Sequence, residues 1–266
     1  MSASASAHAG RDLRVEELCT ALHAMPEARR AECCKQAPSL ELTDECRRGL
    51  DGSLALAAIA LDATAVHTCA TALAAAYEGC EHVGPNHPAI PPSCVGIVRG
   101  LLPAKSKCRS SLECLEGLRC HGVGPTTAGA CDVPHANGEP CGLSIDVLAT
   151  YTGQKELLTK HPECSGVCDR QKCIAPLSLG AACAEGAQCG PGATCTGGKC
   201  LAVKQAKLGQ PCPQGACEEG ARCAAGKCVA PKAAGEACDV DRECLGGCLK
   251  APGEKSGTCG MRCDLP

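Results

Sequence analysis

The sequence predicts a small disulfide-rich protein in which an α-helical, cysteine-bearing N-terminal bundle precedes an array of small β-hairpin and loop disulfide knots. Three observations support this fold class. The chain of 266 residues has 28 Cys and 31 Gly, but no Phe, no Trp and only 2 Tyr. Its cysteines recur in groups of four after residue 106, whereas residues 11–105 are rich in Ala and Leu and show helical periodicity. The repeated part also has too few large apolar side chains to fold by burial alone.

This shortage of apolar side chains means that cross-links must stabilise the repeated part. The segment from Pro176 to Lys232 contains only six large aliphatic residues, which are Leu177, Leu179, Leu201, Val203, Leu208 and Val229. Burying six such side chains at roughly 2 kcal/mol each recovers on the order of 12 kcal/mol. Ordering the segment costs several times as much, at about 1–2 kcal/mol per residue. We therefore expect bonds made by cysteine to supply the difference.

Residues 1–10, "MSASASAHAG", are predicted to be a disordered leader or the remnant of a signal peptide. The segment lacks the apolar region of an intact signal peptide. However, "AHA" at residues 7–9 resembles the small-residue end of a signal, and Met1 would suit a replacement initiator on a mature chain. The sequence leaves both interpretations open.

Residues 11–105 are predicted to form a disulfide-linked helical domain. Further helices are expected in "TDECRRGLDGSLALAAIALD", which opens with Thr43 and Asp44, and in "DATAVHTCATALAAAYEGC". A short helix opened by Ser93 is expected in "PPSCVGIVRGLLP". In the first segment, "RDLRVEELCTALHAM", five residues share one helical face: Val15, Leu18, Cys19, Leu22 and Met25.

The helical domain has an odd number of cysteines, seven, so complete pairing requires a partner outside it. Cys69 and Cys80 would lie about 16 Å apart on one continuous helix, too far to bond. Adjacent Cys33 and Cys34 should reach different partners, because a vicinal disulfide is strained. Either Cys263, which follows the repeat cysteines, pairs with the helical domain, or the pairing shifts at the boundary between residues 94 and 108.

Residues 106–266 contain five cysteine-rich repeats, at about 107–131, 138–173, 180–200, 209–228 and 235–263. In four of them a Gly lies three residues before the first Cys, where the chain must turn. The "GGKC" and "AGKC" segments are typical of hairpin turns before the last Cys. We favour pairing of the first cysteine with the third and of the second with the fourth, although the other two connectivities remain open. The cysteines expected in these disulfides include Cys108, Cys114, Cys120, Cys131, Cys183, Cys189, Cys195, Cys200, Cys212, Cys217, Cys223 and Cys228.

The spacing of the cysteines favours disulfides over a metal centre. Metal-thiolate sites usually contain C-x2-C or C-x-C pairs, which let two thiolates turn onto one ion. Neither pattern occurs in this chain, and the even number of cysteines permits complete pairing. Such a set of disulfides persists only in an oxidising compartment.

The repeat units of the form G-x2-C-x5-C-x2-G-x2-C-x4-C, the "ECC" turn and "LDATAVHTCATALAAAYEGC" resemble a known group of proteins. They are similar to the cysteine-rich secreted proteins and lipoproteins of myxobacteria, whose repeats look like the Dickkopf N-terminal cysteine-rich domain. The resemblance covers most of residues 11–263 and implies an extracellular or bacterial-envelope location. It implies no established activity. The role of animal Dickkopf proteins should not be transferred to this chain, because small disulfide frameworks of this kind carry unrelated functions. The N-terminus has no lipobox cysteine.

Composition and motifs exclude several classes of function. The net charge of −3 is spread without a basic patch, and the lack of aromatic residues removes stacking platforms for nucleic-acid bases. No apolar stretch is long enough to span a membrane. Since G-x-S-x-G, H-E-x-x-H and C-x-x-C motifs are absent, we expect no enzymatic activity, no cofactor and no metal. His67, His82 and His87 are best explained as solvated residues, and His135 and His161 as loop residues without a visible partner.

The long first loop of the second repeat, residues 142–163, is the candidate partner-binding segment. Loops of this length in tight scaffolds are often functional, and an apolar surface with a Tyr anchor suits a protein partner. The alternative, which we favour slightly, is a short helix from about Gln154 that packs on neighbouring repeats. The candidate contact residues are Ile145, Val147, Leu148, Tyr151, Leu157 and Leu158.

Together these features predict a secreted or cell-surface, non-enzymatic cysteine-rich protein. It would act as a binding protein or structural scaffold that presents its helical domain and loops to an extracellular protein, a surface polymer or further copies of itself. One alternative is a protease-inhibitor-like binder that uses the 142–163 loop. A metal-thiolate protein is a third, less favoured possibility.

Overall fold

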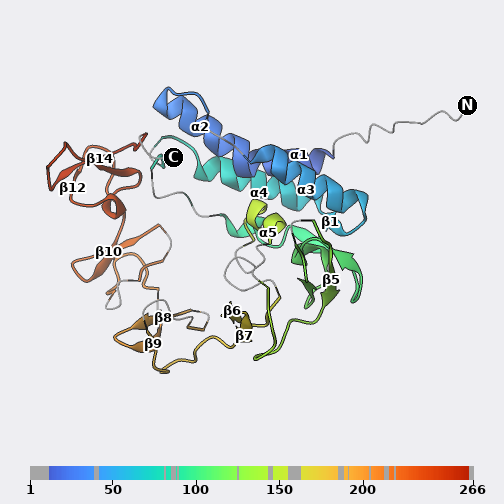
Figure 1. Ribbon diagram of the computed structural model, residues 1–266. Helices are drawn as coiled ribbons and strands as arrows, with labels where there is room; N and C mark the ends of the chain where they lie inside the picture. Colours follow the sequence, from blue (N-terminus) through green and yellow to red (C-terminus); the bar gives the residue numbers. More distant parts are fainter. Residues whose placement is uncertain are drawn as a thin grey trace, which may run out of the picture.

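The computed structural model shows a small disulfide-rich fold that combines N-terminal helices with many short antiparallel strand pairs (Figure 1). It describes residues 12–38, 42–80, 82–84, 88, 90–124, 126–142, 146–154, 163–184, 189–190, 192–203, 205–212, 216–218 and 220–263. The expected leader at residues 1–10 lies outside this set. All cysteines lie within it, and they form 14 disulfides with no free thiol. No helix in the described ranges has the length and apolar character needed to cross a membrane.

The helices of the N-terminal part, here called the head, enclose one hydrophobic core. Asp12 caps α1 by accepting from the Arg14 amide, and Asp62 caps α4 by accepting from the Ala65 amide. Disulfides Cys19–Cys46 and Cys69–Cys94 lie in the core. The expected face of the first helix is confirmed, with three of its residues buried and Leu22 and Met25 packed against the same core. The head helices are α1 (Leu13–Cys19), a π-helical turn (Thr20–Ala24), α2 (Met25–Cys34), α3 (Thr43–Ala55) and α4 (Ala63–Ala76).

Two segments of the head that were expected to be helical instead contain a pair of short strands. Helix α3 ends at Ala55, and Ala57 adopts a left-handed φ of 50°, which reverses the chain. The following β1 (Ile59–Leu61) pairs antiparallel with β2 (Val98–Gly100). The helix expected at Ser93 is only the 3₁₀ turn Pro92–Cys94 before β2. A short strand with alternating burial places Ile59, Leu61 and Val98 in the core as well as a helix would, so their apolar character does not distinguish the two.

Each of the five repeats is built on a short antiparallel hairpin. The first contains β3 (Lys107–Cys108), η3 (Ser111–Glu113), β4 (Arg119–His121) and β5 (Gly129–Asp132), and the second α5 (Val147–Tyr151), β6 (Val167–Asp169) and β7 (Lys172–Ile174). The third contains β8 (Ala193–Thr196) and β9 (Lys199–Ala202), and the fourth β10 (Arg222–Ala224) and β11 (Lys227–Val229). The fifth contains β12 (Ala237–Cys238), η4 (Asp241–Glu243), β13 (Gly247–Leu249) and β14 (Gly257–Gly260).

The disulfides cross in the same way in every repeat. The first cysteine bonds to the third and the second to the fourth, which is the connectivity preferred from the sequence. The third and fourth cysteines are direct cross-strand partners on the hairpin, as with Cys120 and Cys131, yet they are not bonded to each other. Because partner side chains point to one face of a hairpin, the two disulfides of each repeat lie side by side on that face.

The connector before each repeat folds back onto the repeat it precedes. The residue three before the first Cys has a positive φ in all five units: 93° at Gly138, 82° at Gly180, 81° at Gly209, 88° at Gly235 and 69° at Lys105. The residue six before the first Cys forms a parallel bridge with the second Cys. The structural unit therefore begins several residues before its first cysteine. The bridging connector residues are Leu102, His135, Leu177, Ala206 and Lys232.

A glutamate before the second cysteine reinforces this fold in three repeats. Glu113, Glu163 and Glu243 each accept a hydrogen bond from the backbone N–H that follows the first Cys of their own repeat. The Asp239 amide and then Lys232 lower the pKa of Glu243. The carboxylate thus links the segments around the first and second cysteines, which the crossed disulfides do not join directly. The donors are Arg109, Gly142 and Asp239, at 2.6, 2.8 and 2.9 Å.

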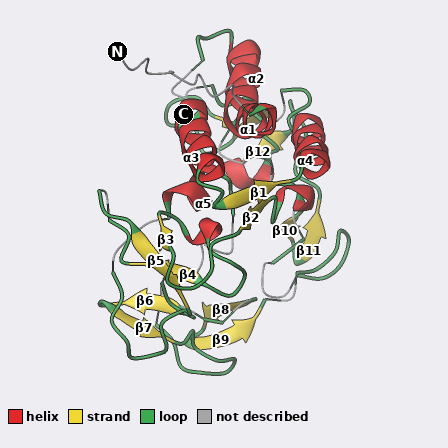
Figure 2. Ribbon diagram, turned by 90° about the vertical axis from the view of Figure 1, so that its right-hand side faces the viewer, coloured by secondary structure: helices red, strands yellow, loops and turns green. Residues whose placement is uncertain are grey.

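The chain closes on itself through the disulfide between Cys34 and Cys263, 229 residues apart in the sequence. The repeats follow an arc from one end of the head helices back to α2, while the helices gather at one end of the molecule (Figures 1 and 2). The Arg262 amide donates to the Val83 carbonyl at 2.9 Å beside this closure. A Cβ on Gly84 would lie 2.5 Å from the Gly246 carbonyl oxygen, so the head and the fifth repeat touch backbone to backbone.

Removing the closing disulfide should open this arc. We expect the double variant Cys34→Ser/Cys263→Ser to have a larger radius of gyration by small-angle X-ray scattering. Its free energy of unfolding should fall by about 3–5 kcal/mol in the chain-entropy view, less where the other disulfides already shorten the loop. Non-reducing denaturation measures the second effect.

The double variant Cys183→Ser/Cys195→Ser is the matched control, since both cysteines of that disulfide are also only half-buried but close a loop within one repeat. It should lose local stability and keep the radius of gyration. Equal radii for the wild-type protein and the Cys34→Ser/Cys263→Ser variant would show that noncovalent contacts alone close the arc.

Candidate binding site between the head and the first two repeats

Helix α5 ties the second repeat to the first through one carboxylate. Asp146 caps α5 by accepting from the Ala149 amide at 3.0 Å. The same carboxylate accepts from the Ser110 hydroxyl and the Ser111 amide, each at 2.7 Å. All four residues are buried, so this cap is also a junction between repeats.

The apolar side of α5 packs on the head. Leu148 is only 7% exposed and belongs to the core cluster of the head, and Tyr151 packs against the same cluster. A Cβ on Gly49 of α3 would lie 3.1 Å from Leu148 Cδ1. His23 Nε2 lies 2.8 Å from the Tyr151 carbonyl oxygen, and the two rings meet edge to face. The lack of a side chain at Gly49 therefore lets α5 pack closely on α3.

The structure thus places only part of the candidate loop. Leu148 is buried against the head, Tyr151 packs on the head but stays half-exposed, and Val147 begins α5. The helix lies at Val147–Tyr151, earlier than the expected start near Gln154. Gln154 itself accepts from the Gly96 amide at 3.1 Å, which ends the segment against the head. Ile145, Leu157 and Leu158 lie outside the described residues.

Glu113 joins the first repeat to the head. Its side chain is 3% exposed and accepts from the Ser53 hydroxyl of α3 at 2.6 Å, in addition to the Arg109 amide. Its backbone carbonyl accepts from the amides of Leu101 and Leu102. These donors satisfy the hydrogen-bonding capacity of the buried carboxylate. The first repeat is therefore fixed to α3 by polar contacts.

A groove of about 310 Å³ lies where α3, the first repeat and α5 meet. Arg48 on its rim pairs with Glu45 at 2.8 Å, whereas Arg109 on the other side is an exposed cation. Leu56 beside it is 63% exposed. The groove therefore offers an apolar floor with charge at its edges, a combination that suits ligand binding. Its lining residues are Glu45, Arg48, Gly49, Gly52, Ser53, Leu56, Arg109, Ser110, Glu113, Leu148 and Tyr151.

The two glycines of α3 contribute to this groove in different ways. At Gly49 an added Cβ would crowd Leu148, as described above. By contrast, a Cβ on Gly52 would meet no atom within 4 Å. Glycine inside a helix costs roughly 0.5–1 kcal/mol relative to alanine. At Gly52 no packing within the described part of the chain offsets this cost, and the groove stays open beside the helix backbone.

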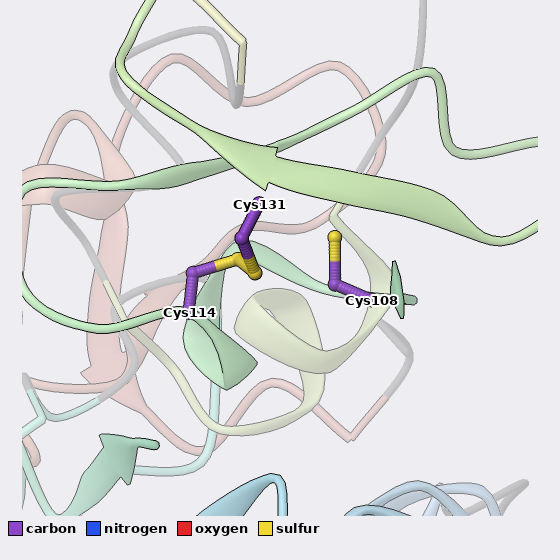
Figure 3. A group of neighbouring side chains, drawn as sticks. All are labelled: Cys108, Cys114 and Cys131. Carbon is purple, nitrogen blue, oxygen red and sulfur yellow. A yellow bond between two sulfur atoms is a disulfide. The ribbon is translucent and has the colours of Figure 1, made fainter. Parts of the chain in front are cut away.

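The cysteines of each repeat form a cluster of potential metal ligands. In each repeat three sulfur atoms lie within 4.8 Å of one another, for example those of Cys108, Cys114 and Cys131. Figure 3 shows that Cys114 and Cys131 are bonded, with the Cys108 sulfur beside them. Metal binding requires thiolates, whereas every cysteine of this chain is in a disulfide. The proximity therefore results from neighbouring disulfides.

A histidine pair lies at the junction of the first two repeats. The rings of His121, in β4, and His135, in the next connector, are 4.1 Å apart at their centroids. Glu163 spans the same junction by accepting from the Gly122 amide at 2.7 Å and the Gly142 amide at 2.8 Å. Burial and then the nearby His135 lower the pKa of His121, although Glu163 opposes this shift. Sequence reasoning treated His135 as a residue without a partner, because no local pattern relates it to His121.

No family model, no curated protein and no solved structure matches this chain. The resemblance to myxobacterial cysteine-rich proteins therefore stays a prediction from the residues.

The two glycines of α3 should respond differently to alanine. Gly52→Ala is expected to raise the free energy of unfolding by about 0.5–1 kcal/mol, because the methyl group improves helix propensity and meets open space. Gly49→Ala should gain less or lose stability, because its methyl group would crowd Leu148. Thermal denaturation under non-reducing conditions measures both variants. Equal gains would contradict the packing of α5 on Gly49.

Stability should also depend on pH through His121. Because its folded pKa lies below the unfolded value of about 6.5, the unfolded chain binds more protons in the window between the two values. The free energy of unfolding should therefore fall as the pH drops through and below about 6.5. Chemical denaturation between pH 7.5 and about 5 measures the slope, and His121→Asn should flatten it. An unchanged slope in that variant would assign the effect to other groups.

Proposed function

We propose that this protein is a secreted or cell-surface, non-enzymatic cysteine-rich protein that binds an extracellular partner. The observation that carries the proposal is the complete pairing of all 28 cysteines into 14 disulfides, with one crossed pattern in five repeats. A chain so dependent on disulfides is consistent with an oxidising, extracellular environment. The repeats would serve as a rigid scaffold, and the groove between the head and the first repeat would be the partner site.

The groove supports binding in preference to catalysis. Its described lining includes neither histidine nor lysine that could act as a base toward Ser53 or Ser110. Ser53 donates to the buried Glu113 carboxylate, which gives the hydroxyl a structural role. A partner segment with one apolar side chain for the floor and an acidic group for Arg109 would match the site. Leu148 and Tyr151, which pack on the head, would form part of the groove wall that the partner contacts.

Two measurements on protein from its native compartment test the proposal. Non-reduced protein should have a mass about 28 Da below that of the fully reduced chain and should take up no alkylating reagent. Cross-linking on whole cells should then capture a specific partner through a photoreactive residue introduced at Leu56. Alkylatable thiols in native protein would contradict the assigned compartment.

Gly52→Leu is the variant that separates binding from folding. It fills the groove from a position where added atoms meet open space, so the protein should fold and keep its disulfide mass. Cross-linking of the partner should fall at least tenfold. Gly52→Ala, with a single added methyl group, is the matched control and should retain the partner. Undiminished capture by Gly52→Leu would place the binding site elsewhere.

A further inference from the structure

We propose that His121 and His135 bind a divalent transition-metal ion, such as Cu²⁺, Ni²⁺ or Zn²⁺, across the junction between the first two repeats. This site lies on repeat faces separate from the groove between the head and the first repeat. It is independent of the function proposed above.

Both imidazoles are held in place by the backbone of the repeats. His121 is the last residue of β4 and pairs with Ala130 of β5. The His135 amide donates to the Glu163 carbonyl at 2.8 Å, and the His135 carbonyl accepts from the Ser165 amide at 3.1 Å. The ring centroids lie 4.1 Å apart with 54° between the ring planes. With metal–nitrogen bonds of about 2.0–2.1 Å, two imidazoles bound side by side on one ion have centroids about 4.5–5 Å apart, so the two rings need to separate by less than about 1 Å to share an ion.

The nitrogen atoms have lone pairs to offer. His121 Nε2 is buried and has no hydrogen-bond partner among the described residues. An unpartnered buried nitrogen is unfavourable, and a metal ion would satisfy it. Glu139 Oε2 lies 3.4 Å from His135 Nδ1. A carboxylate at that nitrogen favours the tautomer protonated there, which leaves Nε2 as the ligand atom, as in many carboxylate–histidine–metal arrangements.

The charges around the pair favour a cation. Glu163, Asp132 and Glu139 are the carboxylates near the rings. Lys105, the basic group that faces His121, is paired with Asp132.

The ligand set determines which ions are expected. Among the described residues, the groups of three or more potential ligands are all disulfide cysteines, so the histidines would supply two ligands and water the rest. Imidazole suits Cu²⁺, Ni²⁺ and Zn²⁺, whereas Ca²⁺ and Mg²⁺ prefer oxygen ligands. Affinity should follow the order Cu²⁺ above Ni²⁺, with Cu²⁺ also above Zn²⁺. No free thiol is present to compete.

Calorimetric titration of the tag-free, full-length protein with Ni²⁺ and Zn²⁺ tests the site. We expect His121→Asn and His135→Asn each to weaken binding more than tenfold, and Glu139→Gln to weaken it by about tenfold, as for a group that orients a ligand. His67→Asn is the matched control. His67 also lies beside a carboxylate, with Nδ1 2.8 Å from Glu17 Oε1, but it is exposed on the head, and its loss should leave this affinity unchanged. Ca²⁺ should give no heat at this site.

Two results would overturn the proposal: no binding of Ni²⁺, Zn²⁺ or Cu²⁺ by the wild-type protein, or unchanged binding by the double variant His121→Asn/His135→Asn. If the variants alter the circular dichroism spectrum, NMR of the wild-type protein labelled on histidine decides. Substoichiometric Cu²⁺ should broaden the signals of His121 and His135 first. Broadening that begins at other histidines would reject the site.

Discussion

The crossed pair of disulfides in each repeat is the constraint on which the rest of this structure depends. The third and fourth cysteines sit opposite each other on a two-stranded hairpin, and each is bonded back to the first or second cysteine of the unit. An isolated hairpin of this length is at best marginally stable in water. Each closed loop, of 9 to 27 residues' separation, restricts the unfolded chain by roughly 3 kcal/mol. Sulfur therefore takes the place of the missing aromatic and aliphatic core, and the surfaces of the repeats are free to carry polar junctions.

The repeat array is not a free string of units, because both of its ends are attached to the head. Buried carboxylates fix the first repeat to the head and the second repeat to the first: Glu113 reaches α3, Asp146 reaches the first repeat from α5, and Glu163 spans the two repeats. The fifth repeat is fixed by the Cys34–Cys263 disulfide and by backbone contact with the head. Attachment at both ends turns the array into a closed arc. It also creates the groove beside α3, which needs the head, the first repeat and α5 together.

Much of the repeat architecture could be predicted because it is local. The glycine three residues before the first cysteine predicts a left-handed turn, and the Gly-Lys pairs predict hairpins. Both signals depend on backbone conformation alone. The candidate site was less predictable. Leu148 and Tyr151 stood out as apolar residues in a polar loop, but nothing local indicates that they pack on the head. The glutamate before the second cysteine recurs in three repeats and could have been noticed. The pairing of His121 with His135 has no such signal.

The sequence by itself determined that the chain is disulfide-rich, that its repeats share one pattern and that cysteines of the head need a partner outside it. These follow from composition, spacing and parity, which do not depend on how distant segments meet. Only the tertiary structure decided that Cys263 bonds to Cys34, that residues 59–61 and 98–100 form strands, and that the groove exists at all. Apolar residues such as Ile59 and Val98 are compatible with helix or strand, and they adopt the conformation that packs on the surrounding core. A disulfide spanning nearly the whole chain likewise depends on the summed curvature of five repeats, which no local pattern encodes.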